Sequence, residues 1–234
     1  MKQILTLSIL LLSGSVAVNA QTKNNSTHKL FTASFQQDSC TFLTTGRNQF
    51  FILEPGYQLI LEGLDGKDSS RLVITVLHET KLIGNLETRI VEENETVNGK
   101  TVEISRNYFA FCKQTGSVYY FGEDVDMYKH NQIVSHEGSW KAVGNNKAGI
   151  AMPGLILLGS GYYQEIAPGI AMDRAEIISI TETKTTKAGI FKNCLMTEET
   201  TPLNIKEKEY KLYAPGIGLI KDEDLWLVKY GFIK

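Results

Sequence analysis

The chain has no excess of charge of either sign. Its 24 Lys and Arg residues stand against 26 Asp and Glu residues, which gives a formal net charge of −2 at pH 7. The basic residues are spread along the whole sequence and form no cluster. Proteins that bind nucleic acids usually carry a basic stripe or patch. We therefore expect no nucleic-acid partner.

Cysteine is scarce, and the three cysteines, Cys40, Cys112 and Cys194, are far apart in the sequence. No Cys-x-x-Cys pair is present, and this spacing does not favour a zinc knuckle. Three cysteines allow one disulfide with a leftover thiol, or no disulfide, and the sequence does not select a pair. Cys194 lies at the start of a predicted strand, where we expect a buried free thiol. The cysteines therefore predict no metal site.

Long apolar runs are absent after residue 20. Before it, Lys2 precedes the apolar run Ile4–Leu12, and small residues lead to Val18-Asn19-Ala20. This order is typical of a signal peptide, and the run is too short for a membrane helix, which needs about 20 apolar residues. The sequence therefore predicts a signal peptide at residues 1–20 and a secreted or periplasmic mature protein without a membrane span.

Helical periodicity is also lacking, and the turn signals are those of antiparallel β structure. Four of the five prolines are followed directly by glycine, at Pro55, Pro153, Pro168 and Pro215, a pair that suits type II turns. Asn98-Gly99 is a strong hairpin signal between two runs rich in β-branched residues. The predicted fold is mostly β, an antiparallel up-and-down meander that forms a barrel, a half-barrel or a sandwich.

The predicted organisation has three parts. Residues 21–49 follow the signal peptide, begin with a polar run without periodicity, and are expected to be a disordered or poorly ordered leader. Residues 50–234 are expected to form a single β domain, since β barrels and sandwiches often contain about 200–250 residues. Within it, residues 145–161 are expected to form an inward-packing loop beside a binding site.

Most catalytic signatures are missing. The sequence has no Gly-x-Ser-x-Gly elbow, no phosphate-binding loop, no dinucleotide-binding fingerprint and no His-Glu-x-x-His motif. We therefore assign no catalytic residue and expect no organic cofactor.

Carboxylates next to aromatic residues are the best candidates for a site. Such side chains can line a cavity that binds sugars or cations or transfers protons. The alternative is a half-buried sheet in which solvent-facing charges alternate with core aromatics. The candidate ligand-binding residues are Tyr120, Glu123, Asp124, Glu137, Trp140, Tyr163, Glu165, Asp173, Arg174 and Glu176.

The Pro168-Gly169 turn gives the most specific geometric prediction. If it closes a hairpin, Glu165 and Asp173 face each other across the two strands, with Arg174 near enough to pair with them. Two adjacent carboxylates raise each other's pKa unless a cation compensates, and Ca²⁺ suits oxygen ligands outside the cell. A Ca²⁺ site is thus possible here, and hydrated surface charges are the alternative.

Five short motifs occur together: YFGED at 120–124, EGSW at 137–140, YQEIAPG at 163–169, FKNCL at 191–195 and YAPGIGL at 213–219. As a set they make residues 51–221 resemble a family of exported bacterial proteins of unassigned activity. The resemblance implies a bacterial source and adds weight to the polar positions as a site. It implies no reaction, so no catalytic role is transferred.

The sequence favours a binding module, a β barrel that holds a small or lipid-like ligand. A secreted hydrolase or lyase that uses a carboxylate pair on an extracellular polymer is the alternative. A structural or interaction protein of the cell envelope is a third hypothesis. The oligomeric state is left open.

Overall fold

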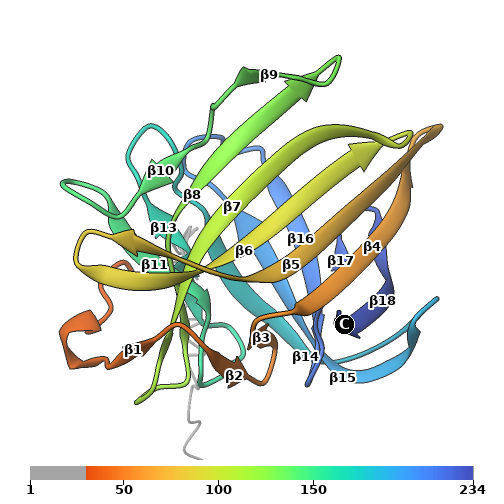
Figure 1. The fold of residues 1–234 in the computed structure, drawn as a ribbon. Helices are drawn as coiled ribbons and strands as arrows, with labels where there is room; N and C mark the ends of the chain where they lie inside the picture. Colours follow the sequence, from red (N-terminus) through yellow and green to blue (C-terminus); the bar gives the residue numbers. More distant parts are fainter. Residues whose placement is uncertain (1–29, 234) are drawn as a thin grey trace, which may run out of the picture.

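The computed structural model describes residues 30–233, and these form one highly curved antiparallel sheet with short additional elements (Figure 1). The first half contains η1 (Gln37–Ser39), β1 (Phe42–Leu43), β2 (Gly46–Asn48), β3 (Phe51–Leu53), β4 (Tyr57–Asp65), β5 (Asp68–Ile83), β6 (Leu86–Val97), β7 (Lys100–Cys112) and β8 (Val118–Lys129). The second half contains β9 (Gln132–Ser135), β10 (Trp140–Lys141), β11 (Lys147–Met152), β12 (Gly161–Tyr163), β13 (Glu165–Ile166), β14 (Arg174–Thr186), β15 (Gly189–Thr200), β16 (Lys208–Ala214), β17 (Gly218–Asp222) and β18 (Leu225–Phe232).

The strand order confirms the predicted up-and-down meander. Thirteen strands follow one path, in the order β12, β14 to β18, β4 to β8, β11 and β13, and every neighbouring pair is antiparallel. The predicted Asn98-Gly99 turn joins β6 to β7. β18 pairs with β4, which joins the C-terminal strands to the N-terminal ones in one sheet, and this sheet is nearly closed into a barrel. No helix in the described range 30–233 has the length and apolar character needed to cross a membrane.

The segment before residue 50 differs from the expected leader. Of the residues expected to be poorly ordered, 30–49 carry η1, β1 and β2, and Cys40 forms a disulfide with Cys112 on β7. Phe35 and Phe42 pack edge-on against Tyr119, in a second apolar core on the outer face of the sheet. These aromatic contacts and the disulfide order a segment whose polar start suggested disorder. Residues 21–29 and the predicted signal peptide lie outside the described residues.

The expected loop at residues 145–161 is wrong in its first part. Residues 147–152 form β11, which pairs with β8 and β13 and contributes Ala151 to the wall of the barrel interior. The remainder of the segment, 153–160, contains no strand.

The two ends of the strand path meet at a seam formed by β12 and β13, which only Gln164 separates in the sequence. β11 crosses this seam at Gly149, whose backbone lies directly against the carbonyl oxygens of Tyr163 and Gln164. A Cβ atom at position 149 would overlap with both oxygens. Glycine is therefore required here for the close approach of two backbones.

We expect Gly149→Ala to destabilise the protein by about 1–3 kcal/mol, because fixed backbone atoms must move to make room for the methyl group. Gly161→Ala is the matched control on the neighbouring β12. There the nearest atoms belong to the Phe31 ring, 3.0 Å away, and a side chain can move aside. Urea unfolding of both variants measures the difference, and equal losses of stability would contradict the steric explanation.

Candidate functional site

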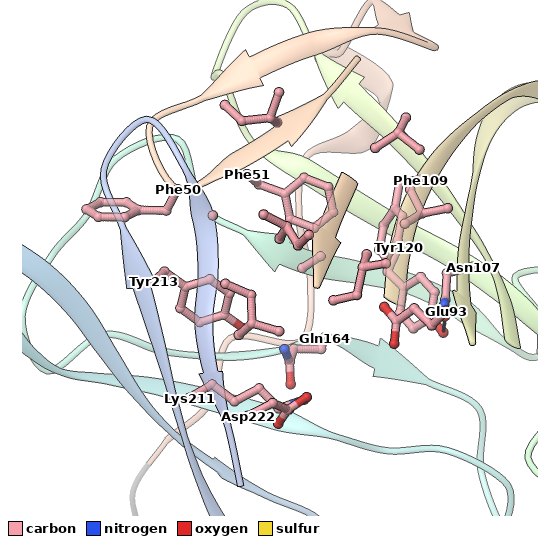
Figure 2. A pocket seen from close by; sticks show the side chains of 18 of the residues that line it. Phe50, Phe51, Glu93, Asn107, Phe109, Tyr120, Gln164, Lys211, Tyr213 and Asp222 are labelled. Carbon is pink, nitrogen blue, oxygen red and sulfur yellow. Dashed lines mark hydrogen bonds and ion pairs between the residues drawn. The ribbon is translucent and has the colours of Figure 1, made fainter. Parts of the chain in front are cut away.

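The interior of the barrel contains a cavity of about 220 Å³ (Figure 2). One part of its wall is apolar and includes Phe50, Phe51 and Phe109, with Leu59 and Val76 from neighbouring strands. Figure 2 shows these phenylalanines towards the top of the cavity and Gln164, Lys211 and Asp222 at the bottom. The cavity therefore has one apolar end and one polar end.

Lys211 on β16 is the centre of the polar end. Its ammonium lies 3.4 Å from a carboxylate oxygen of Glu199 and 3.5 Å from one of Asp222. Burial alone would favour the neutral amine, yet these two carboxylates raise the pKa of Lys211 well above its ordinary value. Lys211 is thus charged and already paired on two sides.

A second chamber of about 190 Å³ adjoins the first and shares Glu93, Lys211 and Asp222 with it. The rest of its wall is strongly acidic, with four further glutamates from β6, β7, β16 and the turn after β17: Glu95, Glu103, Glu209 and Glu223. Glu223 is exposed, so the acidic wall extends to the protein surface.

Several carboxyl groups in or near the two chambers form no ion pair with another described residue, and their pKa values are raised. Burial raises the pKa of Glu93 to about 7, although Lys211 opposes the shift. Burial, with a further contribution from Glu93, raises the pKa of Glu123 to about 7. Burial also raises the pKa of Glu209 to about 7. The polar end therefore holds carboxyl groups that gain and lose protons near neutral pH.

Tyr120 lies where the apolar and polar ends meet. Its hydroxyl donates a 2.6 Å hydrogen bond to Asn107 Oδ1, and its ring stacks on Phe109 with centroids 4.8 Å apart. Trp140 packs edge-on against the same ring, at 5.3 Å. Burial and then the charge of Glu123 raise the pKa of Tyr120 well above its ordinary value. Tyr120 is thus a fixed, neutral hydroxyl in the cavity wall.

The Pro168-Gly169 turn brings Glu165 and Asp173 together, as predicted. Gly169 has a φ of +79°, and Ala167 pairs with Ala171 across the turn. The backbone N–H of Asp173 donates a 2.8 Å hydrogen bond to Glu165 Oε1, and both side chains line the cavity. Burial and then Asp173 raise the pKa of Glu165 well above its ordinary value.

The predicted pairing of Arg174 with these carboxylates is wrong. Its guanidinium lies 4.4 Å from the centroid of Phe31, and no ion pair joins it to Glu165 or Asp173 among the described residues. Arg174 and Glu176 alternate along β14 with Ala175 and Ile177, which belong to the interior core. Because strand side chains alternate between faces, Arg174 and Glu176 lie on the outer face.

The other candidate residues also divide between the inner and the outer face of the sheet. Glu123 is opposite Asn107 in the β7–β8 ladder and so lies on the inner face, whereas Asp124 faces outward and accepts hydrogen bonds from Tyr108 and Lys141. Glu137 is exposed, and Tyr163 lies beside Phe31 at the outside of the seam. The cavity wall contains three of the ten candidates, Tyr120, Glu165 and Asp173, while Trp140 and Glu123 lie close to it without being in its wall.

The sequence did not point to several polar groups of the cavity wall, which lie on β6, β7 and β15 to β17: Glu93, Asn107, Glu199, Lys211, Tyr213 and Asp222. For Lys211 and Tyr213 the sequence contains a usable pattern, because residues two positions apart on a strand lie on the same face of the sheet. In the run Glu92-Glu93-Asn94-Glu95 both faces are polar, so alternation does not show which face is buried.

Among residues 30–233, no group of three or more His, Cys, Asp or Glu side chains is arranged to hold a metal ion. The Ca²⁺ site at Glu165 and Asp173 stays a prediction, which the competition experiment below tests.

Comparisons with known proteins found no matching family model, no matching curated protein and no matching solved structure. The resemblance to exported bacterial proteins therefore stays a prediction, and the functional argument rests on the geometry of the barrel interior.

Proposed function

We propose that this chain is an exported binding protein that holds a small amphipathic, lipid-like ligand inside its barrel. The observation that carries the proposal is the two-ended cavity, with aromatic side chains at one end and buried charged groups at the other. Ligand sites are typically mostly apolar cavities with a few convergent polar groups that fix orientation. The interior matches that description.

The volumes favour a compact ligand. Chambers of about 220 and about 190 Å³ share one wall, and sites for drug-sized ligands usually measure about 300–1,000 Å³. A compound with one alkyl chain or one ring fits this space better than a lipid with two long tails.

The disulfide supports the proposed export. Cys40 and Cys112 are bridged, and such bonds persist in oxidising compartments such as the periplasm or the extracellular space. The signal-peptide pattern at residues 1–20 points the same way.

Co-purification tests the proposal. We expect the protein, after incubation with a lipid extract and gel filtration, to release one class of small molecule when it is unfolded and analysed by mass spectrometry. Ala151→Trp places an indole in the cavity and should abolish this recovery, whereas Leu155→Trp on the exposed loop should not. Protein that is empty in every preparation, or equal recovery from both variants, would count against a binding function.

A carboxylate-dependent hydrolase or lyase is the second candidate. It is favoured by the partly buried Glu93 and Glu123, each with a pKa raised to about 7 by desolvation, since acid–base catalysis works best with groups that titrate near the working pH. Turnover of an extracellular polymer that is lost in both Glu123→Gln and Glu165→Gln, with the fold intact, would favour this candidate over simple binding.

A further inference from the structure

The charge inside the two chambers is strongly one-sided. Among the described residues that line them, Lys211 is the one cation, and it already lies within 3.5 Å of two carboxylates. Against it stand nine carboxyl groups: Glu93, Glu95, Glu103, Glu165, Asp173, Glu199, Glu209, Asp222 and Glu223. An uncompensated acidic interior of this size needs either bound protons or a bound cation.

Tyr213 provides an independent observation. The residue is only 9% exposed, and it lines the cavity on β16, two positions from Lys211 (Figure 2). Its hydroxyl makes no hydrogen bond to another described residue, although most buried polar groups in proteins have a partner. The hydroxyl of a buried side chain that lines a cavity and has no partner among the described residues is available to a ligand.

Glu93 is a second cavity-lining side chain without a hydrogen-bond partner among the described residues. It lies in the wall shared by both chambers, and no hydrogen bond or ion pair joins it to another described residue. Tyr120, by contrast, is satisfied by Asn107. Glu93 and Tyr213 are thus two side chains of the cavity wall, a carboxylate and a phenol, that can each accept a hydrogen bond from a ligand.

We propose that the ligand is an organic amine in its protonated form, whose ammonium group lies between Glu93 and Tyr213 and whose apolar part contacts Phe51 and Phe109. This inference rests on the proposed binding function and names the chemical class of its ligand. An ammonium donates up to three hydrogen bonds and accepts none, so it can donate to the Glu93 carboxylate and to the lone pairs of the Tyr213 hydroxyl.

The same geometry disfavours the opposite charge. A carboxylate ligand would have to compete with Glu199 and Asp222 for Lys211 and would lie beside the acidic second chamber. Like charges brought together in a buried site repel strongly. A fatty acid is therefore a poorer match than an alkylamine of the same length.

Three compounds that share one alkyl chain test the inference: octylamine, octanol and octanoate, titrated calorimetrically into the full-length protein at about pH 8, where Glu93 is ionised and the amine protonated. We expect octylamine to bind at least about ten-fold more tightly than octanol, and octanoate to bind more weakly than octanol. In Glu93→Gln the preference for octylamine over octanol should shrink to about three-fold or less. Glu92→Gln is the matched control, because Glu92 is the next residue on the same strand and pairs with Arg106.

The outcomes separate the inference from the function on which it rests. Equal affinities for octylamine and octanol, or tightest binding of octanoate, would overturn the amine assignment and leave a binding function in place. Ca²⁺ that displaces octylamine and stabilises the fold more strongly would overturn it in favour of a metal site at Glu165 and Asp173. If none of the three compounds binds and lipid extracts also leave the protein empty, both proposals fail.

Discussion

Raising the pH from about 5.5 to about 8 should lower the thermal midpoint of the protein by roughly 10 °C, because buried carboxyl groups must then ionise inside the barrel. Glu93 and Glu123 have pKa values raised by burial to about 7, against 4.5 as the ordinary value. Between these two values the folded state binds more protons than the unfolded state, so stability falls as the pH rises through the interval. Each group contributes about 2 kcal/mol over that range.

At low pH the stability changes with pH in the opposite direction, and it falls as the pH falls. Burial opposes ionisation of Asp124, but hydrogen bonds from Lys141 and Tyr108 hold its pKa below the ordinary value. Its stabilising contribution is present above the unfolded-state pKa and is lost as the pH falls through its folded-state pKa, below about 4. Maximum stability is therefore expected at mildly acidic pH.

Substitution of both glutamates identifies the groups responsible. The Glu93→Gln/Glu123→Gln double variant should be more stable than the wild type at pH 8 and should have a flatter profile between about pH 5.5 and 8. Glu92→Gln, on the other face of β6, should keep the wild-type profile. Calorimetric or circular-dichroism melts across the pH range measure this, and parallel profiles for all three proteins would show that other groups control the stability.

Opening the disulfide should have the second large effect. Cys40 and Cys112 are 72 residues apart, and releasing a loop of that length from the unfolded chain reduces the free energy of unfolding by about 4 kcal/mol. Urea unfolding with and without reductant measures the loss in the unmodified protein. The loss of stability has two causes. The open bond no longer restricts the unfolded chain, and it no longer holds the segment before β1 against the outer aromatic core.

Cys194 provides the control for this experiment. It is buried and free, as expected from its strand position, and Cys194→Ala should leave the effect of reductant intact. A thiol count on the unfolded, unreduced protein should give one thiol per chain. Three thiols, or an unfolding curve that reductant does not change, would mean that the bond contributes nothing in solution.

The fold class could be predicted because antiparallel sheets are specified locally. The Asn98-Gly99 turn and the Pro168-Gly169 turn each determine the chain reversal within a few residues. The ordering of residues 30–49 could not be predicted in this way. Phe35, Phe42 and Cys40 are stabilised by partners far along the chain, and such contacts leave no periodic signal near the residues themselves.

The candidate site could be predicted only where a turn determined the geometry. Glu165 and Asp173 flank one turn, so their proximity followed from local chemistry. Arg174 is adjacent to Asp173, but strand alternation places it on the other face, against Phe31. Glu93 and Lys211 are more than a hundred residues apart in the sequence, and only the closure of the barrel brings them to one cavity.

The pairing of β18 with β4 has a consequence for synthesis and folding. β4, the first long strand, can pair with β18 on its second edge only when residues 225–232 are available, about 160 residues later in the chain. Until then β4 has one free edge, which is open to pairing with another molecule. A growing chain therefore cannot complete the barrel in stages. It must be kept from aggregating until nearly the whole described sequence has emerged, and any truncation before β18 should yield an aggregation-prone product.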